Sequence, residues 1–237
     1  MGSEGRAKIE AILMDCGGVL LLPHPGIVAE ALAANGIRFR LSRAAASEAH
    51  YIGMHAVDDQ AHEGSELNRY LRNYCRAYAV QECDVERAVG LLKNLWRSSS
   101  VDVWRLVVPN CKPALVAMAR CSVRLAVVSN ARGQLEQQLR RRRICQVGDG
   151  AGVQVAAIVD SGVVGIEKPD PRIFELALRP MGVTPCRALY VGDSVRYDVQ
   201  PASMAGLISV HFDPYHLCCK PGEHLHVDNL AQLLAYL

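Results

Sequence analysis

The sequence has no apolar run long enough to cross a membrane, no strong excess of either charge, and no internal repeat or low-complexity segment. A membrane-spanning helix needs about 18 or more apolar residues in succession, so we expect no membrane partner. The formal net charge of +2 over 237 residues excludes the broad positive field that attracts nucleic acid, and we expect no nucleic-acid partner. Half of the residues are hydrophobic, which is typical of a soluble protein with a sizeable core.

The beginning of the sequence also lacks the features of a secretory signal. Residues 1–8 are polar and lead directly into the first apolar run. The nine cysteines are an odd number and are scattered along the chain, which indicates reduced thiols rather than a disulfide framework. We therefore expect a cytoplasmic protein, and either a monomer or a homodimer is compatible with the sequence.

Short apolar segments alternate with amphipathic ones near the start of the chain and again after residue 105. The expected strands are residues 9–14, 123–128, 155–159, 189–191 and 207–211. The expected helices are residues 112–120, 134–142, 171–178 (with Asp170 as its N-cap) and 228–236. Strands that alternate with helices predict an α/β fold with a Rossmann-like, doubly wound parallel sheet.

Between these two parts the pattern is helical, with no convincing strand. Helices are expected at residues 27–35, 42–54 (with Ser42 as its N-cap), 65–80 and 84–97. The sequence therefore predicts a core domain formed by residues 1–22 and 106–237, and a helical domain of residues 23–105 inserted into it.

Polar side chains collect where the expected strands end. Asp15, Ser129, Asn130 and Asp193 each lie at the end of an apolar strand. Because the carboxyl ends of parallel strands meet at one edge of a sheet, these residues should lie close together. Lys168 and Asp198 are expected in loops on the same side.

Four segments built around these residues make a family resemblance specific. They are residues 15–20 (DCGGVL), 127–130 (VVSN), 165–174 (GIEKPDPRIF) and 190–199 (YVGDSVRYDV). In this order and spacing they resemble the motifs of the haloacid dehalogenase superfamily, in the branch that carries a helical cap after the first motif. The resemblance covers nearly the whole chain. The sequence of the expected cap, however, does not indicate a particular substrate.

The resemblance implies a Mg²⁺-dependent phosphatase of a small phosphorylated metabolite. Asp15 would attack phosphorus and form an aspartyl-phosphate, while Ser129 and Lys168 would stabilise the transferred group. The implied Mg²⁺ ligands are Asp15, Asp193, the carbonyl oxygen of Gly17, and Asp198 either as a ligand or as a second-sphere support. The residues expected to contact the substrate are Gly18, His24, Asn130 and Arg132.

Gly17 departs from the family pattern, because most phosphatases of this family carry a second Asp at this position. That Asp protonates the leaving oxygen, and such acid–base help is worth about 10²–10⁴-fold in rate. His24 is the first candidate for a substitute because it follows the turn closely; His50, His55 and His62 are weaker candidates. Two alternatives stay open: a haloacid dehalogenase, which needs no metal, and a catalytically impaired protein that binds Mg²⁺ or phosphate.

The segment 211–226 carries several potential metal ligands. They are His211, His216, Cys218, Cys219, His224 and His226. Their spacing matches no closed zinc-site pattern, so the sequence predicts an ordinary loop there and leaves metal binding open.

Overall fold

The computed structural model describes residues 8–40, 43–59, 65–98 and 100–237. It divides into two compact units. The first, called the core unit, comprises Met1–Leu20, Pro109–Pro214 and Lys220–Leu237; the second, called the insert unit, comprises Leu21–Val108 and Tyr215–Cys219. The sequence had not indicated that the short segment Tyr215–Cys219 groups with the insert unit. In the described part of the chain, no helix is both long and apolar enough to span a membrane.

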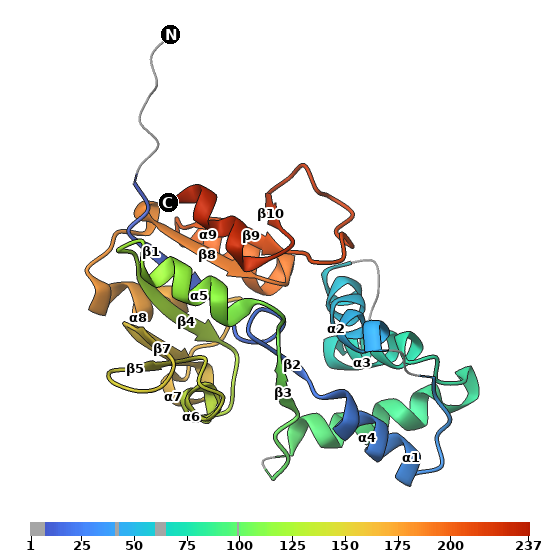
Figure 1. The fold of residues 1–237 in the computed structure, drawn as a ribbon. Coiled ribbons are helices and arrows are strands. Elements are labelled where there is room, and N and C mark those ends of the chain that lie inside the picture. The colour runs from blue at the N-terminus through green and yellow to red at the C-terminus, as the bar shows by residue number, and fades with distance from the viewer. Residues whose placement is uncertain (1–7, 41–42, 60–64, 99) are drawn as a thin grey trace. The chain divides into compact units, whose positions relative to one another are not determined.

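The core unit is built on a six-stranded sheet in which every neighbouring pair of strands is parallel. The strand order is β10-β9-β8-β1-β4-β7. The bounds are β1 Ala11–Met14, β4 Arg124–Ser129, β7 Ala157–Asp160, β8 Ala188–Gly192, β9 Ile208–Phe212 and β10 Leu225–Val227. The predicted Rossmann-like, doubly wound fold is therefore confirmed, and β1 lies in the middle of the sheet (Figure 1).

Side chains alternate along each strand, so both faces of this sheet carry side chains, and different helices pack on each face. On β1, Ala11 and Leu13 belong to a buried cluster with Ile173, Phe174 and other residues of α8 (Arg172–Met181). Helix α5 (Cys111–Ala119) and the 3₁₀ helix η4 (Leu230–Tyr236) pack against each other over the opposite face (Figure 1). Helices α6 (Leu135–Arg141), α7 (Ser161–Val164) and α9 (Gln200–Met204) complete the core unit.

Several predicted elements of the core unit differ in detail from those observed. The strand expected at residues 155–159 is split into β6 (Val153–Val155), which pairs with β5 (Cys145–Val147), and β7 in the main sheet. Helix α8 has Pro171 rather than Asp170 as its N-cap, although an Asp170 carboxylate oxygen still accepts the Arg172 N–H at 3.0 Å. The closing helix is of the 3₁₀ type, and the expected loop at residues 211–226 begins with the last two residues of β9 and ends with the first two of β10.

Among its described residues, the insert unit has four α-helices, as the periodicity predicts, and a short 3₁₀ helix at Glu82–Asp84. The α-helices are α1 Pro25–Ala34, α2 Arg43–Asp58, α3 Glu66–Ala77 and α4 Val85–Arg97. The unit also has an antiparallel pair of strands that the sequence did not reveal, β2 (Leu21–Pro23) and β3 (Trp104–Val107). Ser42, the predicted N-cap of α2, lies outside the described residues.

Candidate active site

Three carboxylates meet at the carboxyl edge of the core sheet. Asp15 follows β1, Asp193 follows β8, and Asp198 lies in the short π-helix η3 (Val195–Val199) rather than in the expected loop. Each is buried, and one oxygen of each lies within 4.8 Å of the others. Ser129 is buried at the end of β4, the strand next to β1. The topology thus brings together the four side chains from distant parts of the chain.

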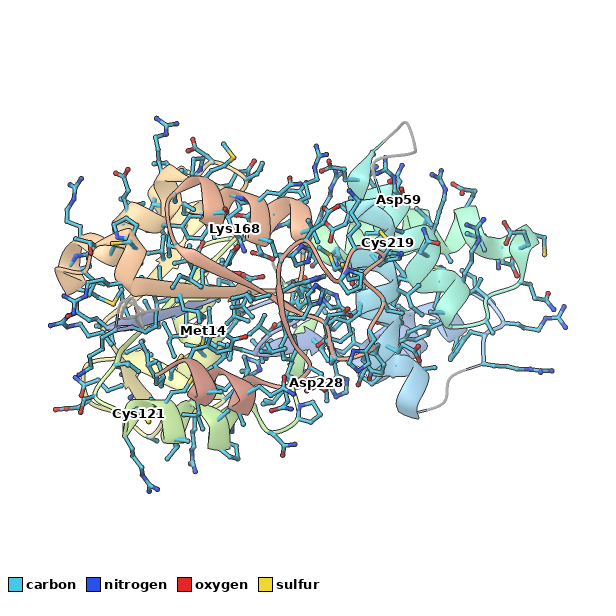
Figure 2. All side chains as sticks on the ribbon, turned by 90° about the horizontal axis from the view of Figure 1, so that it is seen from above. Met14, Asp59, Cys121, Lys168, Cys219 and Asp228 are labelled. Carbon is cyan, nitrogen blue, oxygen red and sulfur yellow. The ribbon has the colours of Figure 1, made fainter. Side chains whose placement is uncertain are left out.

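Lys168 neutralises part of this negative charge. Its Nζ atom lies 3.0 Å from Asp15 Oδ1 and 2.5 Å from Asp198 Oδ1, and the side chain is only 3% exposed. Figure 2 labels Lys168 together with Met14, the last residue of β1, in the core unit. Burial alone lowers the pKa of Lys168, but the two carboxylates outweigh it and raise that pKa above its usual value. Lys168 is therefore a permanent cation at neutral pH.

Asn130 holds the backbone that carries Lys168. Its side-chain NH₂ donates to the Lys168 carbonyl at 2.8 Å, and its side-chain oxygen accepts the Lys168 N–H at 2.8 Å. Both ends of the amide are thus used to fix the lysine loop. The substrate-binding role expected for Asn130 stays a prediction, and the geometry assigns it a positioning role.

Asp198 is occupied by partners within the core unit. Besides Lys168, its Oδ1 accepts the Tyr190 hydroxyl at 2.7 Å, and its Oδ2 accepts the Ser194 N–H at 3.0 Å. A side chain at Gly192 would collide with this carboxylate, because an added Cβ would lie 2.2 Å from Asp198 Cγ. The glycine before Asp193 therefore makes room for Asp198, which suits a second-sphere position better than direct contact with a metal.

Asp15 is less well compensated than Asp198. The pKa of Asp15 is raised to about 6, chiefly by desolvation on burial and further by Asp198 and Asp193, against the lowering effects of Lys168 and of a hydrogen bond with Ser129. Its buried Oδ1 meets Lys168 only as an ion pair and accepts no hydrogen bond of good geometry from the described residues. A carboxylate that is buried, under-bonded and beside a second carboxylate is a suitable ligand for a divalent cation. The donor set of Asp15 and Asp193 therefore fits Mg²⁺, which prefers oxygen ligands.

Two polar residues that the sequence analysis missed fix the loop after Ser129. Asp160, at the end of β7, accepts the Gly162 N–H at 2.9 Å and the Leu135 N–H at 3.1 Å. The Ser161 hydroxyl accepts the Ala131 N–H at 3.1 Å. Asp160 follows an apolar run in the same way as Asp15, so the same signal could have identified it.

Other predicted site residues lie in varied settings. Gly18 has a φ of 73°, a left-handed conformation that favours glycine, whereas Gly17 does not have a positive φ. Arg132 is exposed. The roles expected for these residues stay predictions.

The predicted substitutes for the missing acid belong to the insert unit. His24 is the N-cap of α1. Its buried Nδ1 atom has no hydrogen-bond partner among the described residues. His50 is a packed core residue, with its Nδ1 at 2.9 Å from the Tyr70 hydroxyl. His55 lies on α2 and is half-buried. His62 lies outside the described residues.

The segment after β9 returns to the core sheet. His211 on β9 and His226 on β10 are partners in the register of these parallel strands, and His224 immediately precedes β10. The pKa of His224 is lowered to about 4, chiefly by burial and then by the nearby His226 and His211. The segment thus gathers three imidazoles that the sequence spacing did not suggest.

The comparisons with known proteins agree on one family. The family profile described as "Hydrolase: haloacid dehalogenase-like hydrolase" matches residues 9–206. A phosphoserine phosphatase of Thermus thermophilus is 36% identical over 105 residues, which cover 44% of this chain and 40% of that protein. The haloacid dehalogenase-like hydrolase domain-containing protein 3 of Bos taurus is 29% identical over 161 residues, covering 65% of this chain and 61% of that protein.

Neither of these two relatives is matched over two thirds of its own length. Among solved structures, that of a HAD-superfamily hydrolase from Ehrlichia chaffeensis is similar, with a TM-score of 0.60 and 17% identity. The match covers 98% of this chain and 97% of that chain. At this identity the structural likeness concerns the fold alone.

Proposed function

The chain belongs to the haloacid dehalogenase-like hydrolase family, and on that premise we propose that it hydrolyses the phosphate monoester of a small metabolite. Asp15 is the proposed nucleophile, and residues 23–105 are the proposed cap domain. The observation that carries the proposal is the buried constellation of Asp15, Asp193 and Asp198 around Lys168. The phosphoserine phosphatase of Thermus thermophilus and a glyceraldehyde 3-phosphate phosphatase of Methanopyrus kandleri, 45% identical over 53 residues, support this class of substrate.

A Mg²⁺ ion would be held by Asp15, Asp193 and the carbonyl oxygen of Gly17. Asp198 would hold Lys168 in position through their ion pair. When bound, the ion neutralises the repulsion between a carboxylate and a phosphate dianion and polarises the phosphoryl oxygens. Besides its ion pair with Lys168, the buried Oδ1 of Asp15 accepts no hydrogen bond of good geometry among the described residues, which favours such a partner.

The reaction then proceeds in two displacements on phosphorus. A carboxylate oxygen of Asp15 forms a bond to phosphorus while the bond to the alcohol oxygen breaks, which gives an aspartyl-phosphate. Lys168 and the Ser129 hydroxyl stabilise the charge on the transferring group. Water then cleaves the aspartyl-phosphate, which releases inorganic phosphate and returns Asp15 to its carboxylate form.

Gly17 leaves the departing oxygen without the usual proton donor. Of the side chains around Asp15, Lys168 carries protons, but its raised pKa makes it a poor acid. Esters whose alcohol leaves readily as an anion should therefore react much faster than alkyl phosphates. Replacing Gly17 by Asp should restore the acid, and because general acid catalysis is worth about 10²–10⁴-fold, alkyl phosphates should gain far more than p-nitrophenyl phosphate.

The experiment is a phosphate-release assay with Mg²⁺ across sugar phosphates, nucleotides, phosphoamino acids and phosphorylated cofactors. We expect turnover by the wild type, none by Asp15→Asn, and unchanged turnover by Asp149→Asn, which alters an exposed loop carboxylate. Equal rates for the wild type and Asp15→Asn would refute the proposal. Release of chloride from a chlorinated acid in EDTA would support the dehalogenase alternative instead. Binding of Mg²⁺ without turnover of any ester would support the non-catalytic alternative.

A further inference from the structure

Three histidines form a compact cluster at the edge of the core sheet, and the proposed phosphatase chemistry does not use it. β10 is the edge strand, and its His226 is the register partner of His211 on β9. His224 precedes the strand, and one nitrogen of each imidazole lies within 4.8 Å of the others. Asp228, labelled in Figure 2, follows β10 and marks where this edge ends.

The spacing of two of these nitrogens suits a shared metal ion. His224 Nε2 lies 3.2 Å from His211 Nδ1. With zinc–nitrogen bonds of about 2.0–2.1 Å, two nitrogens on a tetrahedral ion are about 3.3 Å apart. In the absence of an ion, the same distance accommodates a hydrogen bond between the two rings.

The groups behind the imidazoles are those that accompany metal-bound histidines. His211 Nε2 lies 3.3 Å from the Asp193 carbonyl oxygen, to which it can donate, and this leaves Nδ1 facing His224 as a lone-pair donor. His226 Nδ1 lies 3.7 Å from a carboxylate oxygen of buried Asp213. Metal-bound histidines typically direct their second nitrogen to a carbonyl or carboxylate, which fixes the tautomer and the ring orientation.

The cluster is also accessible to an ion from solvent. His211 is buried, whereas His224 and His226 are half-buried, and these two rings are stacked with centroids 4.4 Å apart. Imidazoles suit Zn²⁺, whereas the carboxylates of the proposed active site suit Mg²⁺.

We propose that His211, His224 and His226 bind one Zn²⁺ ion, separately from the carboxylate site, with Asp213 and the Asp193 carbonyl as second-sphere acceptors. The ion would join the edge strand β10 to β9. Through His211, it would also brace the backbone of Asp193.

The test is a titration of the EDTA-treated, dialysed protein with Zn²⁺ against a chromogenic chelator, in excess Mg²⁺ so that the carboxylate site is occupied. The wild type should bind one equivalent. His224→Gln removes a ligand and should weaken affinity by at least about 100-fold, and Asp213→Asn should weaken it by about 10–100-fold. His216→Asn is the matched control, because it removes a histidine of the same segment that is not in the cluster and keeps a residue that tolerates its φ of 54°.

Circular dichroism of each variant without metal establishes that it is folded before its affinity is compared. Loss of Zn²⁺ binding in His224→Gln with retention in His216→Asn supports the site. The same affinity in the wild type and His224→Gln would overturn it, and so would the absence of a bound equivalent in the wild type in this excess of Mg²⁺. Because the readout is metal binding, failure of this test would leave the proposed phosphatase activity untouched.

Discussion

Replacing Asp15 by Asn should make the metal-free protein more stable at neutral pH while abolishing its activity. The pKa of Asp15 is raised from 3.8 to about 6, chiefly because burial disfavours the charged form. The folded state therefore holds the Asp15 proton more tightly than the unfolded state does. As a result, the free energy of unfolding falls as the pH rises from about 4 to about 6, and the deficit persists at higher pH.

The size of this effect follows from the shift. About two pKa units at 1.36 kcal/mol each correspond to about 3 kcal/mol of destabilisation when Asp15 is ionised. Asn keeps the shape of the side chain and, like the protonated acid, removes both the charge and its attraction to Lys168, which the net shift already includes. We therefore expect a net gain of about 1–3 kcal/mol for Asp15→Asn above pH 6, shrinking to nothing near pH 4.

The assay is urea unfolding in EDTA at a series of pH values, followed by the same series in Mg²⁺. Mg²⁺ should stabilise the wild type and have little effect on Asp15→Asn, because the variant lacks the ionised ligand. Asp149→Asn, in an exposed loop, controls for the general effect of removing a negative charge. This account of the site would be refuted if Asp15→Asn were less stable than the wild type at neutral pH. It would also be refuted if the difference in free energy of unfolding between the two proteins did not disappear near pH 4.

Three further substitutions test the supporting groups. Lys168→Met leaves Asp15 and Asp198 buried without their cation, so the free energy of unfolding in EDTA should fall by about 3–5 kcal/mol in urea titrations. Tyr190→Phe keeps the ring against Phe174 but removes the hydroxyl bonded to Asp198, and should cost about 1–3 kcal/mol in the same titrations. Gly192→Ala should lower stability by about 1–3 kcal/mol as its methyl meets Asp198, measured against Gly222→Ala, where a Cβ has open space. The geometry would be contradicted by a free energy of unfolding equal to that of the wild type in Lys168→Met or Tyr190→Phe, or by one in Gly192→Ala that is no lower than in Gly222→Ala.

The central part of the site could be predicted because it follows from strand topology. Asp15, Ser129 and Asp193 each end a buried apolar strand, and parallel strands bring those ends together without any side-chain information. Lys168 lies in a loop, so the sequence indicated it only through the motif that surrounds it. The structure then adds a contact that no spacing could give, namely the amide of Asn130 on the lysine backbone.

The residues that were missed share a physical reason. Tyr190 lies inside an apolar strand, where one hydroxyl does not change the pattern, yet that hydroxyl bonds Asp198. Strand β10 has three residues, one exposed, one half-buried and one buried, and is too short for an alternating pattern to be recognised. Its pairing with β9 therefore could not be predicted, and neither could the meeting of His211 with His226.

Electrostatic stabilisation and proton donation have different structural requirements in this site. The charges proposed to stabilise phosphoryl transfer are held by residues of one unit, where Lys168 lies 3.0 Å from Asp15 Oδ1 and 2.5 Å from Asp198 Oδ1. A proton donor, by contrast, must reach the leaving oxygen of a bound substrate, and Gly17 supplies no side chain for that purpose. An active site can lose this donor and keep its electrostatic stabilisation, because the two act on different oxygens of the ester. The identity of the leaving group should therefore control the rate in this protein more strongly than in family members with Asp at this position.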